Sequence, residues 1–310
     1  MRIVFMGTPE FAVPPLRALL DAGYDVVAAV TQPDRPAGRG HKLTPCPVKV
    51  LAQERNVPVY QFERIKEREG VACLRKLAPD LMVTAAFGQI LSQEILDIPR
   101  HGTVNVHASL LPRYRGSAPI NWCILNGEAV AGVTTMLTDA GMDTGDMLLK
   151  AETPIGELET AGELTARLSE LGARLLIDTL KRYPGGDLRP TPQNPDEASY
   201  QPMLNKEMGR IDWTGSAREI ANQVRGLNPW PCAYTDGEGG RLKVYLAKPC
   251  PARAEAEPGT VVVSGAKEGL FVACGEGWLE ILELQAPNAR RMAAKAYLQG
   301  KRIETGTKFM

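Results

Sequence analysis

The sequence predicts an α/β protein, with a mostly parallel sheet covered by helices on both faces and a small, mostly β domain after it. From residue 2 to about residue 108, the expected strands are nearly continuous apolar runs, and they alternate with helical segments. Beyond about residue 205, short strand-like segments follow one another across Gly-rich turns instead. A length of 310 residues also favours two domains.

The first domain is predicted element by element. RIVFM at 2–6 is a short strand, and GTPE turns the chain into a helix whose prolines fall in the first turns, where proline is tolerated. We then expect strands at 25–32, 57–62, 80–87, 102–108 and 132–138, helices from about 48, at 64–78 and at 92–97, and a Pro/Gly-rich loop at 33–47. Leucines at helical spacing predict a long amphipathic helix over 160–183.

The stretch YPGGDLRPTPQNPDEASYQP is rich in Pro, Gly, Asp and Asn, as connectors are. We therefore place the first domain at 1–189, a linker at 190–205 and a C-terminal domain at 206–310. In the last part we expect a helix at 216–226 and strands at 241–248, 259–264, 269–274 and 277–285, which suits a barrel-like domain.

Composition excludes several classes of protein. Basic and acidic residues both number 36, so no strongly charged partner is indicated, although residues 1–205 carry 21 basic and 24 acidic side chains and residues 206–310 carry 15 and 12. The six cysteines form no CxxC pair, so we expect neither a metal site nor disulfides. No signal-peptide core and no apolar run of about 18 residues is present, so we expect a cytoplasmic protein with no membrane span.

The stretch NVHASLLP places two polar groups on an otherwise apolar strand. A strand's period of two puts Asn105 and His107 on one face, where each needs a partner, because an unsatisfied buried polar group costs about 1–3 kcal/mol. They are either a structural pair or a site, although a lone histidine is more often a satisfied core residue. SLLP then forms a turn whose backbone groups would be free to bond a flat heteroaromatic ligand, or else an ordinary apolar loop.

Other motifs are weaker. The loop TDAGMDTGDM offers Asp139, Asp143 and Asp146, any one of which is more often a turn cap than a catalyst. GTPEFA supplies one glycine of the Gly-x-Gly-x-x-Gly fingerprint, which disfavours a nicotinamide dehydrogenase. Ser109 lacks a Gly-x-Ser-x-Gly turn, and no cysteine falls in the NVH or DTG motifs, so covalent catalysis is disfavoured.

Taken together, Asn-x-His, SLLP and the DTG beginning at Asp143 resemble the signature of the folate-dependent formyltransferases. FMGTPEFAVPPL, TQPDRPAGRGHKLTPCPVK, SLLPRYRGSAPINW and IDW...VRGLNPWP are similar to motifs of the members that act on methionyl-tRNA, and together they span essentially the whole chain. The resemblance implies a Rossmann-like formyltransferase domain with a mostly parallel sheet, a linker and a C-terminal OB-like β-barrel domain that binds tRNA. Three positions depart from the family pattern: Tyr114, Ser117 and Cys232, the last where glycine is usual.

The resemblance also implies the chemistry. The donor is 10-formyltetrahydrofolate and the acceptor is the amino group of initiator methionyl-tRNA. Asn105, His107 and Asp143 become the catalytic residues, with Asn105 and a protonated His107 as donors to the developing oxyanion and Asp143 orienting His107. The folate site is expected at SLLP and at FGQIL, which comprise Ser109, Leu110, Leu111, Pro112, Phe87, Gly88, Gln89, Ile90 and Leu91.

The tRNA is expected at the basic loop of residues 33–47, through Arg35, Arg39 and Lys42, which could clamp phosphates or simply be solvated. Phe11 is expected to contact the methionyl side chain, with helix core as the alternative. We expect a monomer. The remaining alternatives are a relative that formylates an amino sugar on a nucleotide, against which the PAGRG and LNPWP stretches argue, and a non-catalytic tRNA-binding protein.

Overall fold

The structure is a computed structural model that describes residues 1–37, 42–252 and 254–310. The chain divides into two compact units. The first comprises 1–116, 131–153 and 165–201, and the second comprises 117–130, 154–164 and 202–310. The division is interleaved in sequence, because the two short pieces 117–130 and 154–164 belong with the C-terminal residues.

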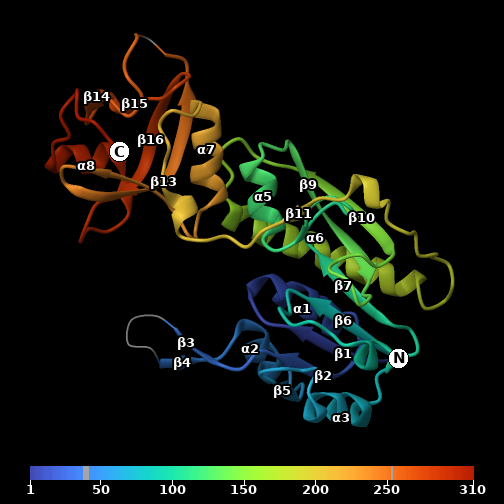
Figure 1. Ribbon diagram of the computed structural model, residues 1–310. Helices are drawn as coiled ribbons and strands as arrows, with labels where there is room; N and C mark the ends of the chain where they lie inside the picture. Colours follow the sequence, from blue (N-terminus) through green and yellow to red (C-terminus); the bar gives the residue numbers. More distant parts are fainter. Residues whose placement is uncertain (38–41, 253) are drawn as a thin grey trace. The chain divides into compact units, whose positions relative to one another are not determined.

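A seven-stranded sheet forms the centre of the first unit (Figure 1). Its strands are β1 (Arg2–Gly7), β2 (Asp25–Thr31), β5 (Val59–Gln61), β6 (Leu81–Ala85), β7 (Thr103–His107), β9 (Val130–Leu137) and β10 (Met147–Pro154), in the order β10-β9-β7-β6-β1-β2-β5. The strands from β5 to β7 are parallel, and β9 is antiparallel to β7. The predicted mostly parallel sheet is confirmed. Ligands of such sheets bind at the carboxyl ends of the strands, where β6 and β7 end side by side.

Helices cover both faces of this sheet, as predicted. They are η1 (Glu10–Ala12), α1 (Val13–Asp21), α2 (Pro47–Glu54), α3 (Arg68–Leu77), α4 (Gln93–Leu96) and α6 (Ala161–Arg182). On one face Met6 and Met82 join Leu74 of α3 and Ile95 of α4 in a single buried cluster. On the other face α1 and α2 pack together, and Gly172 of α6 lies against Val106 and Val133. Because alternate residues of β7 point to opposite faces, Asn105 and His107 point away from α6.

The basic stretch at 33–47 contains a hairpin instead of only a loop. Within the described residues, β3 (Arg35–Ala37) pairs antiparallel with β4 (Lys42–Thr44). The base of the hairpin is fixed by Lys49, whose Nζ lies 2.6 Å from Asp34 Oδ2 and 2.9 Å from Gln61 Oε1. The expectation of a Pro/Gly-rich loop over 33–47 was wrong for Arg35–Ala37 and Lys42–Thr44, because these short segments lack the alternation of apolar residues that predicts a strand.

Part of the predicted linker at 190–205 pairs with the first unit through a short parallel ladder. β8 (Arg115–Gly116) pairs with β11 (Tyr200–Gln201), and Met147 forms an antiparallel bridge with Thr191. The single turn η2 (Pro195–Glu197) lies between these two attachments. The stretch from 191 to 201 therefore runs along the first unit, bonded to it at both ends.

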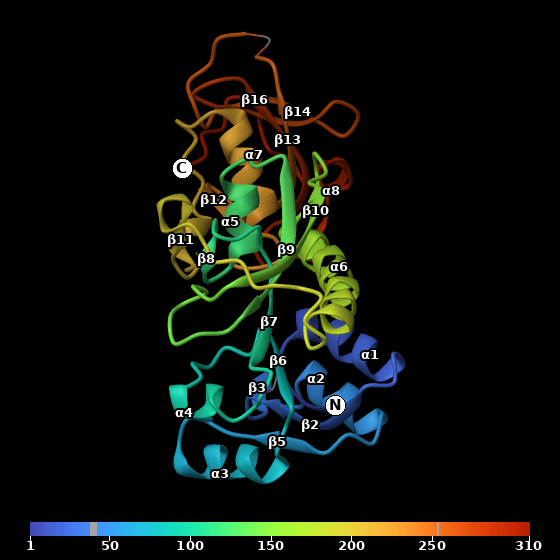
Figure 2. The same ribbon diagram turned by 90° about the vertical axis from the view of Figure 1, so that its right-hand side faces the viewer.

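The second unit is built around an antiparallel sheet. Its elements are α5 (Pro119–Leu125), η3 (Glu207–Gly209), α7 (Ala217–Gly226), β12 (Ala233–Gly237), β13 (Gly240–Cys250), β14 (Val261–Gly265), β15 (Gly269–Ala273), β16 (Trp278–Gln285), β17 (Met292–Ala293) and α8 (Ala294–Gly300). The order is β12-β13-β16-β15-β14, with β17 on β16. Helices α5 and α7 lie side by side (Figures 1 and 2).

The chain end joins the two edges of that sheet. Met310 exchanges backbone hydrogen bonds with Asp236 of β12, while Phe309 donates to Gly259 and Val261 donates to Thr307 beside β14. The sheet is thereby consistent with the small barrel that was predicted. Its core includes Trp213 stacked on Phe309, with ring centroids 6.1 Å apart.

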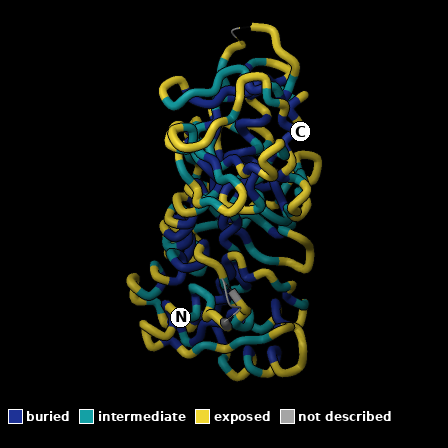
Figure 3. The backbone as a smooth tube through the Cα atoms, turned by 90° about the vertical axis from the view of Figure 1, so that its left-hand side faces the viewer, coloured by how far each residue is buried: buried dark blue, intermediate teal, exposed yellow. Residues whose placement is uncertain are grey.

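Strands β1, β2, β6, β7 and β9 of the first unit are mainly buried, whereas most strands of the second unit mix buried residues with partly exposed ones. Exposed residues gather in the connecting loops (Figure 3). None of the helices in the described part of the chain has the length and apolar character needed to cross a bilayer.

Candidate active site

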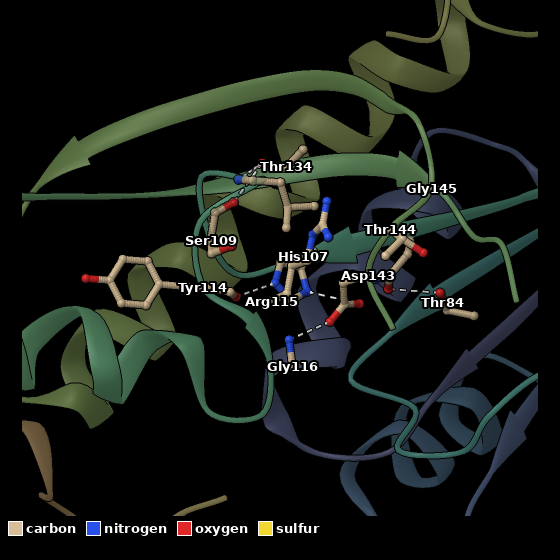
Figure 4. Close-up of polar contacts among 12 residues, drawn as sticks. Thr84, His107, Ser109, Tyr114, Arg115, Gly116, Thr134, Asp143, Thr144 and Gly145 are labelled. Atoms are coloured by element: carbon tan, nitrogen blue, oxygen red, sulfur yellow. Dashed lines mark hydrogen bonds and ion pairs between the residues drawn. The ribbon is translucent and has the colours of Figure 1, made fainter. Parts of the chain in front are cut away.

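His107 ends β7 and lies between two oxygen atoms (Figure 4). Its Nε2 is 3.0 Å from the backbone oxygen of Tyr114, and its Nδ1 is 3.6 Å from Asp143 Oδ1. The ring is 7% exposed. Since a carbonyl oxygen can only accept, Nε2 must carry a proton to bond Tyr114, and the imidazolium is the form that can donate from both nitrogens.

Asn105 is oriented by the neighbouring strand. Thr84 of β6 pairs in register with Asn105, and its Oγ1 donates to Asn105 Oδ1 at 2.9 Å. The amide oxygen is therefore occupied, and Nδ2 is the group that can donate to a ligand. Asn105 and His107 come from the same strand and point to the same side of the sheet.

Asp143 is held in an unusual backbone conformation, with a φ of 54°. Its Oδ2 accepts from the backbone N–H of Gly116 at 2.9 Å, which turns Oδ1 toward His107 (Figure 4). The loop is also tight at Gly145, where a Cβ would overlap the backbone oxygen of Leu137. The sequence therefore needs glycine there for close approach of two backbones.

The aspartates of this loop have different roles in the structure. Asp139 accepts from Thr144 Oγ1 at 2.8 Å and from the backbone N–H of Gly141 at 3.1 Å, so it caps the turn. Asp146 offers its backbone oxygen to Leu137. Asp143 faces the histidine. The described residues contain no cluster of three or more His, Cys, Asp or Glu side chains suited to a metal ion.

The turn Ser109–Pro112 is already partly hydrogen-bonded within the protein. Thr134 Oγ1 donates to Ser109 O at 2.7 Å and accepts from Leu111 N at 3.1 Å, and Lys150 Nζ donates to Leu111 O. The expectation that the backbone groups of this turn are free is wrong for these three. The shape of the turn depends on Thr134 in the neighbouring strand β9, which the local sequence cannot show.

The stretch Phe87–Leu91 follows β6. Phe87 and Leu91 belong to the buried cluster under α3 and α4, and Gln89 is bonded to the backbone of Ile65 and Phe62. Gly88 is exposed and Ile90 is 73% exposed. These two positions therefore offer the open apolar surface of this stretch.

The other predicted contacts are more scattered. Arg35 is exposed and forms an ion pair with Glu63 at 2.6 Å. Lys42 begins β4, and Arg39 lies outside the described residues. Phe11 is 7% exposed, and its backbone oxygen accepts from the buried Ser169 hydroxyl at 2.7 Å. Its burial fits the helix-core alternative, and a methionyl contact stays a prediction.

Sequence reasoning missed the groups that orient the predicted residues. Thr84 was detectable as the polar residue in the apolar run LMVTA, opposite Asn105. Tyr114 and Gly116 act through backbone atoms, and Gln193 binds the Asp143 loop from 48 to 50 residues away. Backbone contacts and long-range side-chain contacts leave no local pattern in a sequence.

The chain matches known families and proteins over nearly its full length. Residues 1–180 match the formyl transferase family model, and residues 203–302 match that of the formyl transferase C-terminal domain. The curated methionyl-tRNA formyltransferase of Geobacter sulfurreducens (strain ATCC 51573 / DSM 12127 / PCA) is 52% identical over 308 residues, which cover 99% of this chain and 96% of that protein.

Two solved structures share the fold. WlaRD, a sugar 3N-formyl transferase crystallised with dTDP and 5-N-formyl-THF, superimposes with a TM-score of 0.67 at 20% identity, covering 94% of this chain and 99% of WlaRD. A variant of HypX from Aquifex aeolicus also gives a TM-score of 0.67, at 18% identity over 98% of this chain, which spans about half of HypX (49%).

Proposed function

The chain belongs to the formyl transferase family, and from this premise we propose that it transfers the formyl group of 10-formyltetrahydrofolate to the amino group of initiator methionyl-tRNA. One observation supports this reaction most strongly: the chain is 52% identical, over 308 residues, to a relative named methionyl-tRNA formyltransferase. The product is N-formylmethionyl-tRNA for the start of translation. We further propose that the protein acts as a monomer in the cytoplasm.

The donor supplies a formyl carbon that becomes tetrahedral, with a developing oxyanion, when the amine attacks. Asn105 supports oxyanion stabilisation because Thr84 fixes its oxygen and leaves Nδ2 as a donor. Such fixed donors lower the barrier because they are already oriented when the charge develops. Removal of one donor of this kind typically costs about 10²–10³ in turnover.

His107 adds a second donor and, when protonated, a positive charge. The Tyr114 carbonyl fixes the ring at Nε2 while the Asp143 carboxylate faces Nδ1. We propose that the Nε2 proton is shared with the oxyanion, and that Asp143 balances the charge and passes the proton of the amine to water. When the oxyanion collapses, the bond between the formyl carbon and N10 of the folate breaks and N10 takes up a proton from water, so the formyl group stays on the amine. The amine must be neutral to attack, so turnover should fall in acid.

The folate site is proposed at SLLP and at the stretch Phe87–Leu91. Three backbone groups of SLLP are occupied, so this turn offers mainly its shape and its remaining polar groups. The exposed Ile90 beside Gly88 supplies an apolar face of the kind that a flat heteroaromatic ring needs.

The tRNA is proposed to contact the β3–β4 hairpin and the C-terminal barrel. Arg35 stands exposed on the hairpin, and the family pattern adds Arg39 and Lys42. Phosphate contacts made by arginine and lysine release counterions, so tRNA affinity should fall steeply with salt.

The first experiment measures transfer of labelled formyl from 10-formyltetrahydrofolate to methionyl initiator tRNA, beside an amino sugar on a nucleotide. We expect transfer to tRNA only, reduced by about 10²-fold or more in Asn105→Ala and His107→Ala. His101→Ala, a second histidine near the other end of β7, is the matched control. Rising salt should raise the KM for tRNA more than that for the donor. Transfer to the sugar alone would mean that the tRNA assignment is wrong.

A further inference from the structure

The two oxygens that face His107 both belong to residues with strained backbones. Tyr114 has a φ of 60° and Asp143 a φ of 54°. Non-glycine residues rarely adopt these angles, and such conformations persist only where surrounding contacts determine them. The contacts that fix these two residues therefore decide where the histidine's partners lie.

One side chain fixes the Asp143 backbone. Gln193 Nε2 donates to the backbone oxygen of Asp143 at 2.8 Å and to that of Gly145 at 2.7 Å. The amide thus bonds both ends of the Asp-Thr-Gly turn at once. Because its two N–H groups are both used, Gln193 determines how the turn is rotated.

The other end of the same amide is also fixed. Gln193 Oε1 accepts two hydrogen bonds from the guanidinium of Arg115, at 3.0 Å from Nε and 2.8 Å from Nη2. Arg115 is 5% exposed, and its Nη1 donates to the hydroxyl of Tyr200 at 2.8 Å. A forked pair of bonds from a buried arginine leaves the glutamine little freedom to turn.

The Tyr114–Arg115 peptide is held by the same stretch of chain. Its N–H, from Arg115, donates to Ser199 O at 2.8 Å, and its C=O is the oxygen that faces His107. In addition, Tyr114 N donates to Ser199 Oγ at 2.9 Å. Figure 4 shows the Tyr114 ring pointing away from His107 while its carbonyl points toward it.

We propose that two residues of the stretch 191–201 position the catalytic groups: Gln193, which acts through Asp143, and Ser199, which acts through Tyr114. This inference rests on the proposed transfer reaction. The composition of this stretch is that of a connector, yet its residues hold both Tyr114 and Asp143, whose oxygen atoms face His107.

The central test is the variant Gln193→Leu, which keeps similar bulk and removes the bonds to Asp143 and Gly145. We expect kcat to fall by about 10- to 100-fold, as expected for catalytic groups displaced by a fraction of an ångström to one ångström. The KM for the donor should change less than about threefold. The matched control is Asn194→Ala. Among the described residues, the Asn194 side chain bonds Asp196 and Glu197 of its own turn, so its removal should leave kcat unchanged.

A double-mutant cycle separates positioning from general damage. In an Asp143→Ala background, Gln193→Leu should lower kcat by less than about twofold, because the group through which it acts is gone. An equal loss in both backgrounds would overturn the proposal, and so would a Gln193→Leu enzyme with unchanged kcat.

A second measurement does not depend on activity. The chain has three histidines, so the ring nitrogen NMR signals of His107 can be followed against the other two. We expect Gln193→Leu to shift the His107 signals and Asn194→Ala to leave them in place. If the wild type transferred no formyl group to tRNA, the proposed function would fail, while a shifted His107 would still support the positioning role. An unshifted His107 in folded Gln193→Leu would refute that role.

Discussion

Cys232 shows how much a single backbone angle can matter. Its φ is 72°, in the region that favours glycine, and glycine is usual at this position in the family that the sequence resembles. The side chain is buried at 6% exposure, and its Sγ lies 2.8 Å from the backbone oxygen of Pro229. Burial of the thiol and its hydrogen bond offset part of the free energy that the positive φ costs the folded state.

Two substitutions at Cys232 separate these effects. Cys232→Ala and Cys232→Gly both lose the thiol, but only alanine keeps a Cβ at positive φ. We expect Cys232→Gly to be more stable than Cys232→Ala by about 1 kcal/mol, or roughly 2–4 °C in unfolding midpoint. Calorimetry of the two variants measures the difference. A Cys232→Ala protein as stable as Cys232→Gly would show that the angle carries no cost here.

At the scale of one element, α7 begins with a reciprocal cap. Ser216 Oγ accepts from the backbone N–H of Glu219 at 3.2 Å, and Glu219 Oε2 accepts from Ser216 N at 2.9 Å. The Ser216 backbone N–H and hydroxyl hold the pKa of Glu219 below its usual range. All partners of this cap lie within three residues of each other, and the helix they begin is the one predicted at 216–226.

The cap makes the start of α7 sensitive to acid. Since the pKa of Glu219 is lower in the folded state, its contribution is present above the ordinary pKa of about 4.3 and is lost as pH falls through the folded value. We expect the wild type to unfold at a higher temperature than Glu219→Gln near pH 7, with a difference that shrinks below about pH 4. Glu238→Gln, in the exposed turn after β12, is the control. A difference independent of pH would contradict the ionic contribution.

At the scale of the whole molecule, sequence order and packing do not coincide. Helix α5 comes from the first half of the chain but belongs to the second unit. There Ile124 is 0% exposed. A Cβ added to Gly226 of α7 would lie 3.0 Å from the Leu125 side chain, so the two helices approach closely at this glycine. Asn121 Nδ2 also donates to Gly226 O at 2.8 Å. A cut at residue 205 therefore separates α5 from its partner.

We expect a fragment of residues 1–205 to unfold at least about 5 °C below the full chain and to bind an apolar dye. The reason is that burial of one large apolar side chain contributes about 1.5–3 kcal/mol, and 1 kcal/mol shifts the midpoint by about 2–4 °C. Replacing Ile124 by serine in the fragment should reduce dye binding, which locates the exposed face. A fragment with the midpoint of the full chain and no dye binding would show that α5 needs no partner.

The site could be predicted as far as its residues form local motifs. Asn105 and His107 are two apart in a strand, so their shared face follows from the period of the backbone, and the Asp-Thr-Gly motif marks Asp143. The domain bounds at 189 and 205 stay a prediction. The pairing of Arg35–Ala37 with Lys42–Thr44 was missed because neither three-residue strand shows the apolar alternation that predicts a strand. The turn at Ser109 was predicted wrongly because its partner Thr134 lies 25 residues away.

The sequence by itself determined the alternation of apolar strands and helices, the shared face of Asn105 and His107, and the helix at 216–226. Each of these depends on residues a few positions apart, where backbone geometry alone fixes the outcome. Only the tertiary structure decided that Tyr114 offers its carbonyl to His107 and that Gln193 holds the Asp143 turn. These contacts join parts of the chain up to 50 residues apart and often use backbone atoms, which every residue type shares and no motif can therefore reveal.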